Sequence, residues 1–179
     1  MAFALGSVLI SKTEIEDTVA ALGQQITDDY PDGRLRLVVA LKGAYLFAAD
    51  LARAIDRDVS IDFLRASSYG PETESSGQVV ISRDLELDLT GSHELLVEDI
   101  VDTGHTAQAL IAHLTQRGAE SVRVAALMSK LSRRVVDIEI DYVGFEISNM
   151  FVVGYGMDLD ERYRNLPDIR LLRDDDRDD

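Results

Sequence analysis

An apolar segment that passes directly into a helix at a glycine limits the folds that this chain can adopt. The apolar residues within 95–101 form an almost continuous run, which is typical of a strand whose two faces are both covered. From Thr106 the apolar residues recur at helical spacing, until Gly118 offers a stop signal. The turn between the two segments needs Gly104 for its backbone freedom. We therefore expect a central parallel strand that leads into a helix.

The turn that joins these segments carries side chains suited to a sugar phosphate. In an open α/β sheet, ligands collect at the carboxyl ends of the strands, where a helix N-terminus presents free N–H groups to an anion. A monophosphate fits residues 103–106, with the hydroxyls of Thr103 and Thr106 as further donors. Glu98 and Asp99 are suited to a ribose diol or a divalent cation, because hard cations prefer carboxylate oxygens. A purely structural strand end remains an alternative, whereas a Walker B motif requires a G-x-x-x-x-G-K-[ST] loop that the sequence lacks.

Strand and helix patterns alternate along the rest of the chain, as they do in βαβ units. A helix should begin at Ser11, because Ser11 and Glu14 stand at capping-box spacing. The expected elements are helices over 11–30, 46–55 and 106–117, strands over 35–41, 59–64, 79–83, 95–101, 122–128, 142–145 and 151–155, and an exposed loop over 67–78. We predict an α/β fold with one domain over 1–172, followed by a disordered acidic tail over 173–179.

Composition excludes several classes of protein. A chain of 179 residues without cysteine can form one domain with a core, but no disulfide and no thiolate zinc site. Its apolar runs fall short of the roughly 20 residues that a membrane span needs, and its first residues lack the basic region of a signal peptide. The net charge of −15 disfavours binding to nucleic acids or anionic membranes. An anionic substrate therefore depends on local positive charge, for which Mg2+ and the few lysines are the candidates.

Four segments together resemble the type I phosphoribosyltransferases. Residues 98–106, which read Glu-Asp-Ile-Val-Asp-Thr-Gly-His-Thr, resemble the phosphoribosyl pyrophosphate signature of that family. Residues 38–47 are similar to its Leu-Lys-Gly pyrophosphate loop, and residues 65–70 to the start of its mobile lid. Residues 143–167 are similar to the purine-binding end of the hypoxanthine-guanine phosphoribosyltransferases. The resemblance implies a mostly parallel sheet flanked by helices, with a small hood and a lid over 67–78.

The resemblance also implies a purine salvage reaction. A purine nitrogen would displace pyrophosphate from carbon 1 of phosphoribosyl pyrophosphate, which gives IMP from hypoxanthine and GMP from guanine. Asp102 matches the proton acceptor of the family, a role that suits a carboxylate beside the base. Glu98 and Asp99 would bind the ribose hydroxyls, directly or through Mg2+. The 5′-phosphate would lie on Thr103, Gly104, His105 and Thr106, and the pyrophosphate on Lys42, Gly43 and Arg164.

The base-binding residues follow from the same resemblance. Lys130 matches the residue that donates to the 6-oxo group, which hypoxanthine and guanine carry and adenine lacks. Phe151 would stack on the purine, and the backbone at Val152 would contact its edge. Asp158 is expected on the side of the 2-position, where it would also contact a second Mg2+.

The resemblance implies three further expectations, which concern the metal, the lid and the backbone. The implied metal residues are Glu98, Asp99 and Asp158. Tyr69 would exclude water beneath the closed lid. The bond between Leu41 and Lys42 is expected to be a non-proline cis peptide, a geometry found mainly at functional sites.

The base preference and the assembly stay open at this point. Residues 148–150 and Met157 differ from the commonest sequence of the family near the base pocket. The order of preference among hypoxanthine, guanine and xanthine is therefore undetermined. The alternatives are a xanthine-preferring enzyme, a pyrimidine relative with an RNA-binding role, and a catalytically silent binding module. The segment around Lys130 favours an oxopurine over uracil, the acidic surface disfavours RNA, and the retention of Asp102 disfavours a silent module. The family suggests a cytoplasmic homodimer or homotetramer that binds neither nucleic acid nor membrane.

Overall fold

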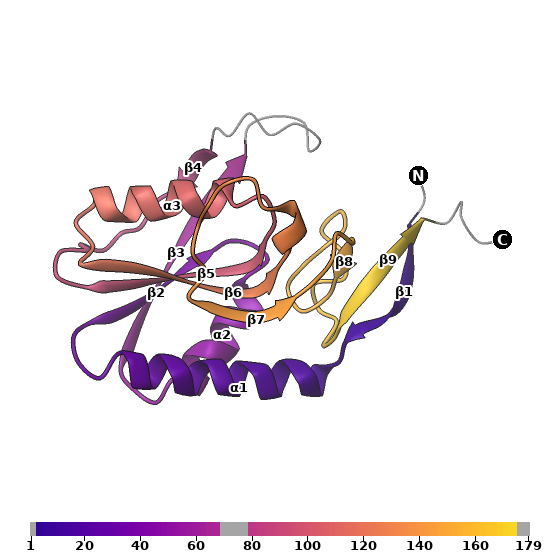
Figure 1. Cartoon of the computed structure of the whole chain (residues 1–179), viewed down its shortest axis with the longest axis horizontal. Coiled ribbons are helices and arrows are strands. Elements are labelled where there is room, and N and C mark those ends of the chain that lie inside the picture. Colours follow the sequence, from indigo (N-terminus) through magenta and orange to yellow (C-terminus); the bar gives the residue numbers. More distant parts are fainter. Residues whose placement is uncertain (1–2, 69–78, 175–179) are drawn as a thin grey trace.

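The computed structural model describes residues 3–68 and 79–174, which form two sheets (Figure 1). The larger sheet has six strands in the order β4-β3-β2-β5-β6-β7. They are β2 (Leu35–Ala40), β3 (Val59–Ser68), β4 (Val79–Arg83), β5 (His93–Val101), β6 (Ser121–Ser129) and β7 (Tyr142–Glu146). Neighbouring strands are parallel, apart from β4, which runs antiparallel to β3. The predicted α/β fold is confirmed, and β5 holds the expected central position.

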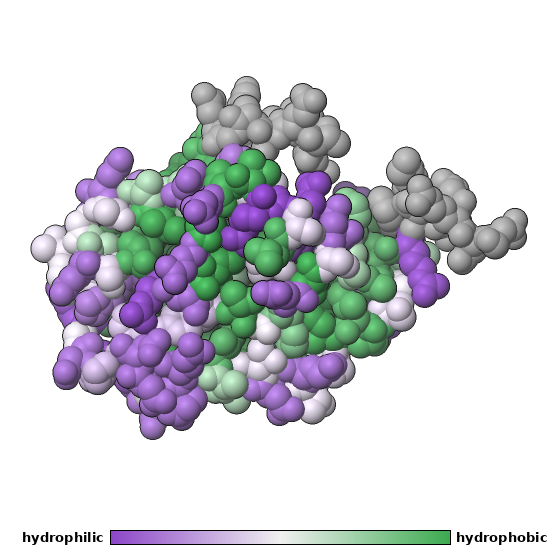
Figure 2. Space-filling model, in the orientation of Figure 1, coloured by the Kyte–Doolittle hydropathy of each residue, from purple (hydrophilic) through white to green (hydrophobic). Residues whose placement is uncertain are grey.

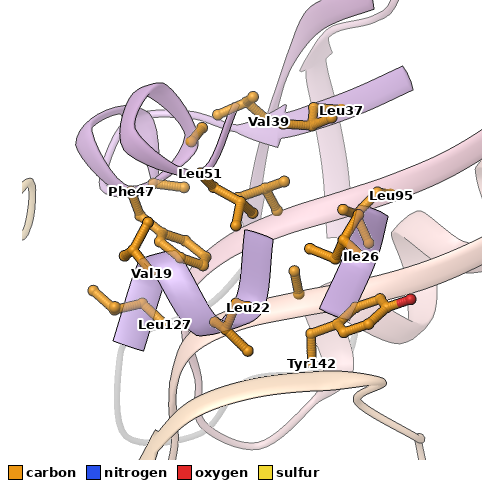
Figure 3. Packing of buried hydrophobic residues seen from close by; sticks show 14 of the residues in the cluster. Val19, Leu22, Ile26, Leu37, Val39, Phe47, Leu51, Leu95, Leu127 and Tyr142 are labelled. Atoms are coloured by element: carbon orange, nitrogen blue, oxygen red, sulfur yellow. The ribbon is translucent and has the colours of Figure 1, made fainter. Parts of the chain in front are cut away.

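Helices cover both faces of this sheet. Helices α1 (Lys12–Asp29) and α2 (Tyr45–Ala54) lie on one face, and α3 (His105–Gln116) lies on the other (Figure 1). The core beneath α1 and α2 is shown in Figure 3, where side chains of both helices meet side chains of the strands. Its labelled members are Val19, Leu22, Ile26, Leu37, Val39, Phe47, Leu51, Leu95, Leu127 and Tyr142. Complete burial of one such aliphatic or aromatic side chain contributes about 1.5–3 kcal/mol, so the two helices are firmly docked.

The start of α1 follows the capping pattern read from the sequence. Ser11 is the N-cap, and its side chain accepts a hydrogen bond from the Glu14 amide at 3.3 Å. The Ser11 amide in turn donates to Glu14 Oε2 at 2.8 Å. The predicted capping box is therefore confirmed, and it satisfies N–H groups that a helix start otherwise leaves unpaired.

Strand β3 extends beyond its predicted end at residue 64. Antiparallel pairing with β4 lengthens it, with Ser68 opposite Val79 and Ser67 opposite Val80. The first two residues of the expected lid therefore belong to a strand. The rest of that segment, 69–78 with Tyr69, lies outside the described residues.

A second, three-stranded sheet stands beside the first (Figure 1). It contains β1 (Phe3–Ile10), β9 (Ile169–Asp174) and β8 (Val152–Val153), in the order β1-β9-β8. This sheet corresponds to the hood that the resemblance implies, although the sequence patterns did not predict β1 or β9. Strand β9 also takes in the first two residues of the predicted tail over 173–179, of which 175–179 lie outside the described residues.

The strand expected over 151–155 is much shorter than predicted. Only Val152 and Val153 form β8, which pairs with Leu171 and Arg170. The chain then turns at Gly154, with a φ of 102°, and at Tyr155, with a φ of 45°. Positive φ values are incompatible with a continuing strand, so the apolar pattern alone overestimated its length.

The surface of the molecule carries both hydrophobic and hydrophilic residues. On the face shown in Figure 2, hydrophobic residues gather in the middle and hydrophilic residues dominate towards the lower left. Among the described residues, no helix is long and apolar enough to cross a bilayer.

Candidate active site

The turn between β5 and α3 has the backbone of an anion-binding site. Gly104 is the N-cap of α3 with a φ of 90°, and no side chain caps the helix there. A side chain on Gly104 would place its Cβ 2.8 Å from Val136 Cγ2, so both conformation and space require glycine. The first N–H groups of α3, from His105 and Thr106 onward, have no partner within the helix and lie at the positive end of its dipole. This geometry suits the phosphate expected on Thr103–Thr106.

Two buried carboxylates precede this turn. Glu98 is 7% exposed, and its Oε1 has no hydrogen-bond partner in the structure. Burial, with Asp99 as a second cause, raises the pKa of Glu98 to about 8. Burial likewise raises the pKa of Asp99. At neutral pH the pair therefore favours a bound cation or a hydroxyl donor, either of which stabilises the ionised carboxylates.

These residues fit Mg2+ held jointly by protein and substrate. The unpaired Glu98 oxygen and the neighbouring Asp99 supply the hard oxygen donors that Mg2+ prefers. Within the described ranges, no three His, Cys, Asp or Glu side chains gather into one metal cluster. Asp158 instead forms an ion pair with Arg164 at 2.7 Å. The arrangement therefore suits an ion that keeps substrate oxygens among its ligands.

The loop after β2 packs directly against one of the two buried carboxylates, that of Asp99. The peptide bond between Leu41 and Lys42 is cis, as the family resemblance implied. A Cβ on Gly43 would stand 1.6 Å from Asp99 Oδ2, so any side chain there would displace the carboxylate. A Cβ on Gly156 would stand 2.1 Å from the carbonyl oxygen of Gly43. Two glycines thus permit the close contact between this loop, Asp99 and the hood.

Two cations expected at the pyrophosphate site converge on one carboxylate, that of Glu161. Lys42 Nζ lies 2.7 Å from Glu161 Oε1, and Arg164 donates to Glu161 Oε2 at 3.1 Å. Arg164 also pairs with Asp158 and donates to the Gly156 carbonyl at 2.7 Å. The hydrogen bond from Lys42, followed by that from Arg164, lowers the pKa of Glu161. Glu161 was not predicted from the sequence, because a charged turn usually reads as a solvated surface.

Asp102 is bracketed by two basic side chains. Lys130 Nζ lies 3.5 Å from Asp102 Oδ2, and Arg133 Nε donates to Asp102 Oδ1 at 3.1 Å. Lys130 follows β6, and its amide donates to the Val101 carbonyl at 3.0 Å. Arg133 ends the short 3-10 helix η1 (Leu131–Arg133) and was also not predicted.

A cavity of about 190 Å³ adjoins Lys130. It is lined by Asp99, Ile100, Lys130, Phe151, Val152, Met157 and Asp158. Lys130 Nζ lies 5.8 Å from the centre of the Phe151 ring, and Phe151 is 71% exposed. The cavity is smaller than the 300–1,000 Å³ typical of sites for drug-sized ligands. It therefore suits one heterocyclic base, and the Phe151 ring belongs to its lining.

Comparison with known proteins identifies the family. The phosphoribosyl transferase domain matches residues 10–160 of the chain. This chain belongs to that family. The hypoxanthine-guanine phosphoribosyltransferase of Bacillus subtilis is 45% identical over 166 residues, which cover 93% of this chain and 92% of that protein. The enzyme of the same name from Streptococcus thermophilus is 44% identical over 168 residues, which cover 94% of this chain and 93% of that protein.

Solved structures of the family share the whole fold. The hypoxanthine phosphoribosyltransferase of Staphylococcus aureus superposes with a TM-score of 0.92 at 40% identity, and the match covers 98% of this chain and 95% of that one. A hypoxanthine-guanine phosphoribosyltransferase of Bacillus anthracis gives a TM-score of 0.91 at 38% identity, and the match covers 97% of this chain and 100% of that one. The family and the fold predicted from the sequence are thereby confirmed.

Most of the residues expected to bind ligands in this phosphoribosyltransferase lie around one edge of the large sheet. Contacts join Gly43 to Asp99, Lys130 to Asp102, and Asp158 to Arg164. Phe151 and Val152 border the same cavity as Lys130. Tyr69 belongs to the segment that the structure does not describe, so its role stays a prediction.

Proposed function

We propose that this phosphoribosyltransferase transfers the 5-phosphoribosyl group from phosphoribosyl pyrophosphate to hypoxanthine, guanine or both. The products would be IMP or GMP and pyrophosphate. The observation that carries the proposal is the position of Lys130, whose buried ammonium borders a base-sized cavity and lies beside Asp102. A cation there suits a 6-oxo acceptor and disfavours the amino group of adenine. The names of the relatives support the same activity.

Each group in the site would have a defined task. Lys130 would donate to the 6-oxo group while Phe151 stacks on the ring. Asp102 would take the proton that the attacking purine loses, and its charge would stabilise the positive charge that develops on the ribose. The first turn of α3 would hold the 5′-phosphate and so fix carbon 1 in line with the base.

The leaving pyrophosphate would be held on the side of carbon 1 opposite the attacking base. Lys42 and Arg164 would contact the pyrophosphate oxygens, for which the planar fork of arginine is well shaped. When bound, Mg2+ would neutralise part of the negative charge on the pyrophosphate. Glu98 and Asp99 would hold the ribose hydroxyls and that ion, and Asp158 would serve a second ion.

The direct test is product analysis. The chain, phosphoribosyl pyrophosphate, hypoxanthine and Mg2+ should give IMP and pyrophosphate in equal amounts, measured by chromatography and a coupled pyrophosphate assay. Excess EDTA should abolish the reaction, and renewed Mg2+ should restore it. Pyrophosphate without IMP would indicate hydrolysis of the activated ribose, and the absence of both products would contradict the proposed function.

Gly43→Ala should weaken the binding of phosphoribosyl pyrophosphate. Its Cβ would stand 1.6 Å from Asp99 Oδ2, so the carboxylate must leave its place at the ribose. We expect the KM for phosphoribosyl pyrophosphate to rise about tenfold, because small misplacements of positioning groups have large effects. Steady-state kinetics checks the prediction, and a thermal melt shows whether the variant is folded. A folded variant with the KM of the original chain would contradict the close contact.

Glu161→Gln should strengthen pyrophosphate binding. The Glu161 carboxylate forms ion pairs with both Lys42 and Arg164. An incoming pyrophosphate must therefore break these ion pairs to bind the two cations. We expect the dissociation constant for pyrophosphate with Mg2+ to fall roughly two- to tenfold, since the exposed ion pairs are individually weak. Isothermal titration calorimetry measures it. The control is Asp160→Asn, which also converts a carboxylate into an amide, one residue earlier, and should leave the dissociation constant unaltered. Weaker pyrophosphate binding by Glu161→Gln would contradict the prediction and show that Glu161 supports the site.

Assembly and location belong to the same proposal. We expect a homodimer or homotetramer in the cytoplasm, with no nucleic-acid or membrane partner. In the hypoxanthine phosphoribosyl transferase of Trypanosoma cruzi, whose structure is similar to this one, the C-terminal region has a role in the oligomeric state. Light scattering coupled to size-exclusion chromatography would give the mass of the assembly formed by this chain.

A further inference from the structure

Asp102 is held by two cations that differ in their surroundings. Lys130 is 8% exposed and lines the base cavity, whereas Arg133 is 46% exposed and stands outside the lining of that cavity. Each contacts a different oxygen of the carboxylate, Oδ2 for Lys130 and Oδ1 for Arg133. A base that enters the cavity can therefore engage Lys130 without displacing Arg133.

The main chain places Arg133 beside Asp102. The amides of Val135 and Val136 both donate to the Thr103 carbonyl, at 3.0 and 3.3 Å. Lys130 is tied in the same way to Val101. The segment that carries Arg133 is thus bound at both ends to the turn that carries Asp102, so the contact follows from the backbone and not only from a side-chain rotamer.

Base binding changes the charge balance at Asp102. Once the 6-oxo group engages Lys130, that ammonium is shared between the base and the carboxylate. A carboxylate with fewer fixed partners would rotate more freely, although proton transfer needs it within hydrogen-bond reach of the purine. Arg133 remains as a charged donor on the oxygen that Lys130 does not contact.

We propose that Arg133 is a positioning residue, which keeps Asp102 oriented and charge-balanced after the base has engaged Lys130. The inference rests on the proton-accepting role proposed above for Asp102. Arg133 itself would touch neither the base nor the ribose. Its loss should therefore lower the rate of the chemical step and leave substrate binding nearly unchanged.

The first test compares Arg133→Met with Arg133→Lys. Arg133→Met keeps much of the side-chain length and removes the charge. It should lower kcat roughly tenfold, while the KM values for hypoxanthine and phosphoribosyl pyrophosphate stay within about twofold. Arg133→Lys should recover most of the lost rate. Arg53→Met, which removes an exposed arginine paired with Asp50 on α2, should retain the original kcat.

A double-mutant cycle separates the inference from the function on which it rests. If Arg133 acts through Asp102, Arg133→Met should cost less than about twofold in the Asp102→Asn background. An equal tenfold loss in both backgrounds would overturn the inference, and so would an unchanged kcat in Arg133→Met. Full turnover by the single variant Asp102→Asn would instead contradict the proton-accepting role of Asp102, and the inference about Arg133 would fall with it.

Discussion

Asp102→Asn should lower kcat by roughly 10²–10⁴-fold, the usual contribution of a positioned acid or base. The amide keeps the shape of the carboxylate but cannot take the proton of the purine, and it carries no charge to stabilise positive charge on the ribose. Asp102 is partly exposed, at 36%, and the amide oxygen can still accept a hydrogen bond from Lys130 or Arg133, so the fold should survive. Single-turnover and steady-state rates of IMP formation measure the effect.

The control for this variant is Asp58→Asn. Asp58 is an exposed carboxylate just before β3, at the end of the sheet opposite the site. It should retain the turnover of the original chain. We expect the kcat of Asp102→Asn to be at least about a hundredfold below that of the control. A kcat within about threefold of the control would assign proton transfer to another group.

Lys130→Met should lower kcat/KM for hypoxanthine and guanine by about a hundredfold. The variant removes a nearly buried cation from the wall of the base cavity and replaces it with an apolar side chain of similar length. A hydrogen bond from a charged donor contributes about 1.5–3 kcal/mol, which at its upper end corresponds to that factor. Because adenine gains nothing from this donor, the preference for hypoxanthine over adenine should fall as well.

Competition between the two bases measures this preference directly. Lys12→Met is the matched control, since Lys12 is 64% exposed and pairs with Glu16 on the surface of α1. The control should show the original selectivity. A Lys130→Met enzyme that is slower but equally selective would mean that Lys130 acts on Asp102 and not on the base.

Local patterns predicted the part of the fold that carries the phosphate turn. The apolar run of β5, the glycine at 104 and the helical spacing after it are all close in sequence, and each has a direct physical meaning. The bounds of α3 and β5 differ from those predicted by one or two residues. The cis bond before Lys42 came from the family resemblance, because no local pattern encodes it.

The family resemblance implied the hood, but its strands β1 and β9 were not predicted from the sequence patterns, because their pairing is long-range. Strands β1 and β9 come from opposite ends of the chain, with Phe3 opposite Asp174, and no turn links them. Neither segment shows its partner in the sequence. For the same reason, the sequence pattern placed Arg173 and Asp174 in an acidic tail, whereas in the structure both residues pair with β1.

Glu161 and Arg133 were missed for a different reason. Both lie in short, charged segments that are typical of solvated surface, and their meaning depends on a partner distant in sequence. Lys42 precedes Glu161 by 119 positions, and Asp102 precedes Arg133 by 31. The roles of the other ligand-binding residues stay predictions, although their mutual contacts now limit which substitutions are informative.

The central claim is best tested by the kcat/KM values for five bases with phosphoribosyl pyrophosphate and Mg2+ held saturating. Hypoxanthine, guanine, xanthine, adenine and uracil would be offered separately, and the nucleotide product would be quantified for each. We expect efficient turnover of hypoxanthine, guanine or both, and negligible turnover of adenine and uracil. Turnover confined to xanthine or uracil, or efficient use of adenine, would contradict the assignment of Lys130 and its cavity to a 6-oxopurine.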